Sequence, residues 1–160
     1  MPHIHEKIDF CVETFVVYKN TVLLRKHDKY KIWLSVGGHI ELNEDPVEAA
    51  VREVREEVGL DVVLDGEVQS FQNSDRGSGH KALIPPYFLS RHRINETHEH
   101  VVLVYFAKTE TDELKFPERE VSDGCHWFTK EELIKNDFGV PEDIRFYALK
   151  ALEKLGENKK

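Results

Sequence analysis

The chain has 160 residues and a formal net charge of −8 at pH 7, and 40% of its residues are hydrophobic. This length suits one domain with a sizeable core, and we place that single domain at residues 1–160. The acidic balance argues against a general nucleic-acid binder, which would usually carry a basic face.

The two cysteines and the N-terminal sequence indicate where the protein works. Cys11 and Cys125 are predicted to be reduced thiols, because cytosolic disulfides are rare. The first ten residues, MPHIHEKIDF, lack the apolar run of a signal peptide. The apolar stretches are strand-sized, far short of the roughly 20 residues that a membrane helix needs. We therefore expect a cytoplasmic protein with no membrane partner.

The first part of the chain predicts strands followed by a helix. Residues 10–18 and 21–24 are rich in β-branched and aromatic side chains, and the turn signal at 19–20 between them predicts a hairpin. Residues 33–36 form a short apolar run that leads into a predicted turn at Gly37 and Gly38. The segment 43–46, with a capping-type residue and a proline, then predicts a helix that runs to about Val58 and ends at Gly59.

The second part mixes strands, a loop and two more helices. Strands are predicted at 60–64 and 67–71, and the polar, glycine-bearing segment 73–80 predicts a loop. Residues 100–107 are the most hydrophobic segment and predict a central strand. A short strand at 125–128 precedes a helix capped by Thr129, and helical spacing of apolar residues predicts a last helix over 141–155. The tail, residues 156–160, should be frayed. This order predicts a mixed sheet covered by helices.

Residues 38–60 carry a motif with nine specified positions. They match G-x5-E-x7-R-E-U-x-E-E-x-G-U, where U is aliphatic, without a gap or substitution. At average residue usage, a chance match at a given start is on the order of one in a billion. With this motif the chain resembles the Nudix hydrolases. The resemblance implies an α/β protein with the Nudix fold, an α/β/α sandwich with a mixed β-sheet.

The helical part of the motif predicts a metal site. Glu53, Glu56 and Glu57 stand at i, i+3 and i+4, so their carboxylates share one side of the helix. A separate apolar stripe would face the sheet: Val47, Ala50, Val54 and Val58. Mg²⁺ prefers hard oxygen ligands, which this acidic side supplies. A merely solvated acidic face is the alternative, and the flanking glycines and Glu44 at fixed offsets argue against it.

The resemblance also implies roles for individual residues. The implied metal ligands are Gly37, through its carbonyl, and Glu53, Glu56 and Glu57. Glu53 either adds a ligand or orients the attacking water, which makes it one candidate base. Arg52 is expected to hold the catalytic glutamates in place, and Glu44 to close the loop–helix junction. The implied cofactor is Mg²⁺, with Mn²⁺ as the alternative ion.

A second candidate base lies outside the motif. Many Nudix enzymes take an extra carboxylate from the region just before the central strand, where this chain has Glu96 and Glu99. Either residue is an alternative to Glu53 as the catalytic base.

Three basic side chains are candidates for substrate binding. Arg25, His98 and His100 are predicted to contact phosphate, and the two histidines share a side of an extended strand. As a zinc site, this histidine pair lacks two further ligands at a recognisable spacing. His39, at a variable position of the motif, is given no role.

The resulting hypothesis is direct hydrolysis of a phosphoanhydride. A metal-activated water attacks one phosphorus of a nucleoside diphosphate derivative, such as a nucleoside triphosphate or ADP-ribose, and no nucleophilic side chain is needed. The alternative is a Nudix-fold nucleotide-binding or regulatory module without catalysis, which would usually have damaged motif glutamates. The expected partner is a small-molecule nucleotide rather than a nucleic acid, and the resemblance implies a homodimer.

Overall fold

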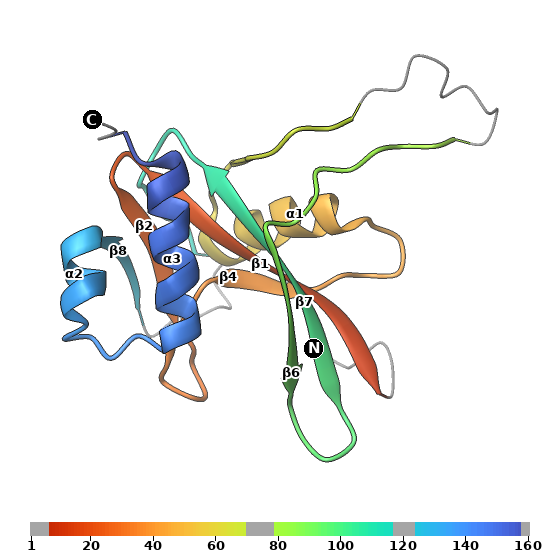
Figure 1. Ribbon diagram of the computed structural model, residues 1–160, viewed down its shortest axis with the longest axis horizontal. Helices are drawn as coiled ribbons and strands as arrows, with labels where there is room; N and C mark the ends of the chain where they lie inside the picture. The colour runs from red at the N-terminus through yellow and green to blue at the C-terminus, as the bar shows by residue number, and fades with distance from the viewer. Residues whose placement is uncertain (1–6, 70–78, 117–123, 158–160) are drawn as a thin grey trace.

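The computed structural model describes residues 7–69, 79–116 and 124–157. Within these ranges, eight strands form one mixed sheet, which lies between helix α1 (Pro46–Val58) and helix α3 (Glu142–Leu155). In Figure 1, α3 crosses the near face of the sheet and α1 lies behind it. This α/β/α arrangement confirms the predicted fold class.

Strand β1 (Ile8–Tyr18) is the centre of the sheet. Along one edge it pairs in parallel with β7 (Glu99–Lys108). Along its other edge it pairs antiparallel with β4 (Val36–His39) in its first half and with β2 (Thr21–Lys26) at its end. The predicted hairpin and central strand are confirmed, and β1, β2 and β7 are each longer than predicted.

The other strands extend the sheet on both sides. Strands β3 (Trp33–Leu34) and β8 (Cys125–Thr129) pair with β2. Strands β5 (Val63–Leu64) and β6 (Phe88–Arg93) pair with β7. All of these pairings are antiparallel, so the parallel pair at the centre makes the sheet mixed.

Two predictions about strands and turns are wrong. Gly37 and Gly38 were predicted to form a turn, but they lie inside β4, where they pair with Glu13 and Val12 of β1. The predicted strand at 67–71 is absent over residues 67–69, and residues 70–71 lie outside the described ranges. Strand β6 pairs instead with the edge of β7 that such a strand would extend. The pairing begins where the Tyr87 N–H donates to the Val104 carbonyl.

The core has two faces because side chains alternate along β1. Cys11, Phe15 and Val17 pack toward α3, and Val12 and Val16 pack toward α1. All five side chains are buried. Helix α3 therefore covers one hydrophobic cluster and α1 covers two, and β1 contributes to all three.

Local capping explains where the helices begin and end. Asp45 and Glu48 form a capping box at the start of α1, and Gly59 ends the helix in the left-handed region with φ 68°. Thr129 caps the short helix α2 (Lys130–Lys135), as predicted. None of the helices in the described ranges is long and apolar enough to cross a membrane.

The C-terminal tail is held at its beginning. The Glu157 N–H donates to the Asn20 side chain at 2.9 Å and lies 3.3 Å from the Lys19 carbonyl. The prediction that the tail is frayed from residue 156 is therefore wrong for its first two residues, because the β1–β2 turn anchors them. Residues 158–160 lie outside the described ranges, as do residues 73–78 of the predicted loop.

Glu13 makes the stability of the fold depend on pH. Its side chain is half-buried in β1, and burial, together with the charge of Asp143, raises the pKa of Glu13 from 4.5 to about 7. Glu13 ionises near pH 4.5 in the unfolded chain and only near pH 7 in the folded protein. The free energy of unfolding should therefore fall as the pH rises from 4.5 to 7. We expect Glu13→Gln to flatten this dependence and to raise the free energy of unfolding at pH 8 by up to about 3 kcal/mol. Urea unfolding with a chelator present measures it, and equal pH slopes for both proteins would contradict the prediction.

Candidate active site

Helix α1 turns two of its motif glutamates toward the interior. Glu53 and Glu57 are only 5% and 8% exposed, whereas the side chain of Glu56 is 59% exposed. They join a buried face that also contains Ala49, Ala50, Val54 and Val58. The acidic side of the helix is therefore not wholly solvated, because the carboxylates of Glu53 and Glu57 lie against strand β4.

The two glycines of β4 provide the space for these carboxylates. The Gly37 N–H donates to Glu57 Oε2 at 3.1 Å. A Cβ atom on Gly38 would lie 2.4 Å from Glu53 Oε1, closer than nonbonded atoms can approach. A larger residue at position 38 would therefore displace the Glu53 carboxylate.

Two arginines balance the charge of the three glutamates. Arg25 Nη2 of β2 lies 2.9 Å from Glu57 Oε1. Arg52 Nη1 lies 2.9 Å from both Glu53 Oε1 and Glu56 Oε2. The contact with Glu53 lacks hydrogen-bond alignment, so this buried oxygen keeps an unused acceptor site. Burial raises the pKa of Glu53 even though Arg52 opposes the shift.

Arg52 also ties the catalytic helix to the loop before it. Its guanidinium makes a bidentate pair with Glu44, with Nε–Oε2 and Nη2–Oε1 distances of 2.9 and 2.7 Å. The same Nη2 donates to the His39 carbonyl at 3.0 Å. This pairing raises the pKa of Arg52 and lowers that of Glu44, so both groups stay charged. The contacts suit the positioning roles predicted for these two residues.

Arg52→Lys is expected to weaken the affinity of the site for Mg²⁺ by about 10- to 100-fold. The planar guanidinium of Arg52 donates hydrogen bonds to Glu44, Glu56 and the His39 carbonyl at once. A lysine ammonium is a single point charge and cannot make all of these bonds. The Mg²⁺ dependence of turnover measures the change. Arg55→Lys is the matched control, because Arg55 of the same helix pairs with the exposed Asp61 at the surface. An unchanged Mg²⁺ dependence in Arg52→Lys would contradict the prediction.

The residues present fit a hard divalent cation. Two buried carboxylates would be costly without compensating charge, and Glu53 has an oxygen with an unused acceptor site. Carboxylate and carbonyl oxygens are the donors that Mg²⁺ and Mn²⁺ prefer. Arg25 and Arg52 pair with these carboxylates in the structure, and Glu53, Glu56 and Glu57 are the residues that would hold a cation.

The carboxylates outside the motif lie near the start of β7. Glu99 pairs with Arg91 of β6, with Arg91 Nε donating to Glu99 Oε2 at 2.6 Å. Glu96 is exposed in the turn between β6 and β7. The role of either carboxylate as a base stays a prediction.

The three predicted substrate-binding residues are divided between two places. Arg25 lies beside Glu57, whereas His98 and His100 belong to a separate cluster. Their roles in substrate binding stay predictions. The sequence reasoning missed His39, whose Nε2 lies 3.3 Å from His100 Nε2. The two histidines are far apart in the chain, so spacing gave no signal, and only strand pairing brings them together.

The cysteines do not supply a nucleophile. Both are free thiols, as predicted. Burial, with the nearby charges of Asp9, Glu13 and Glu53, raises the pKa of the Cys11 thiol to about 12. Since the thiolate is the reactive form, Cys11 is a poor nucleophile at neutral pH in this state.

Comparisons with known proteins identify the family. Residues 13–150 match the family model of the NUDIX domain. The crystal structure of a NUDIX-family hydrolase from Clostridium perfringens is similar, with 39% identity, 91% of this chain and 97% of that chain covered, and a TM-score of 0.82. A MutT NUDIX hydrolase from Burkholderia pseudomallei is 19% identical, with coverages of 94% and 99% and a TM-score of 0.62, and it shows the shared fold alone.

A curated relative matches over a shorter stretch. Dihydroneopterin triphosphate diphosphatase of Escherichia coli (strain K12) is 43% identical over 47 residues. These residues are 29% of this chain and 31% of that protein, so the match spans less than a third of the relative's length. The family match and the Clostridium structure, in contrast, cover most of the chain. The chain therefore belongs to the Nudix family, whose members generally use a divalent metal and act on small-molecule nucleotides.

Proposed function

We propose that this protein carries out Mg²⁺-dependent hydrolysis of the pyrophosphate linkage in a nucleoside diphosphate derivative, by means of a metal-activated water. The observation that carries the proposal is the burial of Glu53 and Glu57 against Gly37 and Gly38, with Glu56 one turn away on the same helix. Buried carboxylates at a glycine-lined strand form a site for a hard cation, and such a cation binds phosphate oxygens as well.

Each residue of the site has a defined part in this proposal. Glu56, Glu57 and the Gly37 carbonyl hold Mg²⁺, and Glu53 either joins them or accepts the proton of the attacking water. A bound Mg²⁺ neutralises the charge of the diphosphate and lowers the pKa of water. Burial of Glu53 favours its protonated form, which makes its carboxylate the stronger proton acceptor. Glu99 is the alternative base.

The substrate class follows from the charge at the site. The guanidinium of Arg25 beside Glu57 places a positive group where a phosphate oxygen would approach the metal. A nucleoside triphosphate and ADP-ribose both carry the required linkage. The short match to dihydroneopterin triphosphate diphosphatase adds dihydroneopterin triphosphate as a third compound to test.

A substrate panel tests the proposal. The protein is treated with a chelator, and Mg²⁺ or Mn²⁺ is then restored with each compound in turn, including sugar nucleotides and oxidised nucleoside triphosphates. We expect turnover to return with the metal and to be concentrated on one compound. Hydrolysis in ¹⁸O-labelled water, followed by mass spectrometry of the products, identifies the phosphorus that is attacked.

The outcomes separate an enzyme from a binding module. Failure to hydrolyse any compound, combined with retained binding of one of them, would favour the nucleotide-binding or regulatory alternative. Turnover that persists in the chelator would overturn the metal-dependent mechanism. Sedimentation of the same sample tests the homodimer, which is part of the proposal by family resemblance.

A further inference from the structure

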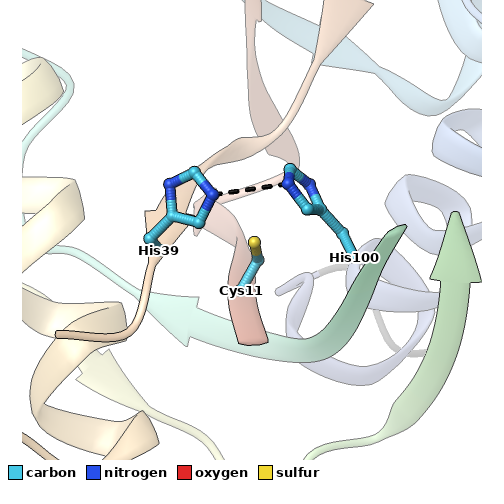
Figure 2. Close-up of side chains that lie close together, drawn as sticks. All are labelled: Cys11, His39 and His100. Atoms are coloured by element: carbon cyan, nitrogen blue, oxygen red, sulfur yellow. Dashed lines mark hydrogen bonds between the residues drawn. The ribbon is translucent and has the colours of Figure 1, made fainter. Parts of the chain in front are cut away.

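A second cluster of potential metal ligands lies on the sheet, built by three different strands. Cys11 of β1 and His39 of β4 are directly opposite each other in the antiparallel pair. His100 comes from β7, on the other edge of β1. In Figure 2 the sulfur atom of Cys11 points toward the space between the two imidazole rings.

The distances within this cluster suit a tetrahedral ion. The ligand atoms of Cys11, His39 and His100 all lie within 4.8 Å of one another. The two Nε2 atoms of the histidines form a hydrogen bond at 3.3 Å, and their rings are nearly perpendicular at 85°. Two nitrogen atoms bound to tetrahedral zinc at 2.0–2.1 Å would be about 3.3–3.4 Å apart. The histidines are therefore already spaced as zinc ligands.

Asp9 and His98 form an adjoining group that shares His100 with this cluster. Asp9 is paired with His100 in the β1–β7 register, and its Oδ2 lies 3.4 Å from His39 Nε2. His98 Nε2 lies 3.3 Å from the same oxygen. Asp9, His98 and His100 also have ligand atoms within 4.8 Å of one another. His98 thus stands where it would orient the Asp9 carboxylate.

This cluster is separate from the glutamate site, although β4 contributes to both. Successive residues of a strand point to opposite faces. Gly38 faces the Glu53 carboxylate on the α1 side, and His39 faces Cys11 on the other side. In Figure 1, β1, β6 and β7 extend beyond the end of α3, so the helix leaves this part of the sheet uncovered.

The cluster lies at the boundary between the interior and the surface. Asp9 and Cys11 are 1% and 7% exposed. His39 and His100 are only partly buried, so an ion has a route past the imidazole rings.

We propose that Cys11, His39 and His100 form a zinc site distinct from the Mg²⁺ site, with a water molecule as the fourth ligand and the Asp9 carboxylate beside it. Thiolate and imidazole ligands select zinc over Mg²⁺, which prefers the oxygen ligands of α1. On binding, the Cys11 thiol releases its proton to solvent, and the thiolate and the Asp9 carboxylate together balance the charge of Zn²⁺. Because Arg52 donates to the His39 carbonyl, zinc would also brace the strand that positions the catalytic glutamates.

Metal titration of the untagged full chain tests the proposal. The protein is stripped with a chelator and titrated with Zn²⁺ in excess Mg²⁺, which occupies the hard-oxygen site. We expect one equivalent of zinc to bind and to raise the Tm. Substitution with Co²⁺ should give the visible bands of a tetrahedral ion and a thiolate-to-cobalt charge-transfer band in the near ultraviolet.

Variants assign the ligands. Cys11→Ser should remove the charge-transfer band, and His100→Gln should weaken zinc binding by at least about 100-fold, more than the loss of an outer partner does. His126→Gln is the matched control, since His126 lies in β8, which pairs with β2 rather than with β1, and contacts Glu132. A His3→Ala/His5→Ala double variant excludes zinc held by the N-terminal histidines, which lie outside the described ranges.

Three results would overturn the proposal. The first is the absence of zinc binding in excess Mg²⁺. The second is a cobalt spectrum of the parent protein without thiolate charge transfer, which needs no variant and so does not depend on a variant folding. The third is equal zinc affinity in His100→Gln and His126→Gln.

Discussion

Glu57→Gln is expected to lower kcat/KM by about 1,000-fold, which corresponds to about 4 kcal/mol of transition-state stabilisation. Glutamine keeps the size of the side chain, and its amide oxygen can still accept the Gly37 N–H. It loses the charge that would bind the metal and that now pairs with Arg25 at 2.9 Å. Steady-state kinetics at saturating Mg²⁺, on the best substrate of the panel, measure the effect.

A control variant distinguishes a loss of activity caused by the missing carboxylate from one caused by unfolding. Glu131→Gln removes the charge of an exposed glutamate in α2 and should leave both kcat and Tm near the parent values. Circular dichroism of Glu57→Gln checks that the variant is folded. A folded Glu57→Gln protein with kcat/KM within about threefold of the parent would sink the assignment of Glu57 as a metal ligand, because that loss is under 1 kcal/mol.

Gly37→Ala should have the largest effect on stability, lowering the free energy of unfolding by about 3 kcal/mol. A Cβ atom at this position would lie 2.0 Å from the Val12 carbonyl oxygen and 2.9 Å from its carbon. Both are backbone atoms of the central strand, so relief requires the β1–β4 pairing to open. Urea unfolding, monitored by far-ultraviolet circular dichroism, measures the loss.

Gly38→Ala is a matched control, because it should affect turnover more than stability. In Gly38→Ala the new Cβ meets the carboxylate of Glu53, which is the end of a flexible side chain and can rotate away. We therefore expect a smaller loss of stability than in Gly37→Ala, together with a large loss of turnover. Equal destabilisation by the two substitutions would contradict the different environments of the two glycines.

Local rules in the sequence predicted the catalytic helix well. The proline and capping residues before α1 and the glycine after it specify its start and end, and these signals act over a few residues. The sequence-based prediction of secondary structure failed where pairing with a distant strand determines the conformation. Gly37 and Gly38 look like a turn when considered alone, and they form a strand because β1 pairs with them.

The candidate site shows the same division. The spacing of Glu53, Glu56 and Glu57 indicated a metal site. The inward direction of Glu53 and Glu57 depends on the packing of α1 against β4, which spacing does not report. The contact between Arg25 and Glu57 joins β2 to α1, and the sequence offered Arg25 only as one of several cations. His39 gave no signal, because its partners come from β1 and β7.

Strand β4 has only four residues, and it contributes both to the glutamate site of α1 and to the cluster of Cys11, His39 and His100. Its residues alternate between the two faces of the sheet, so Gly38 faces the glutamates of α1 and His39 faces Cys11. Inserting or deleting one residue before Gly38 would reverse that alternation and turn an imidazole toward the catalytic carboxylates. The loop before β4 can therefore change in length only if the pairing of β4 with β1 keeps its phase, whereas the loop after β4 is free of that constraint.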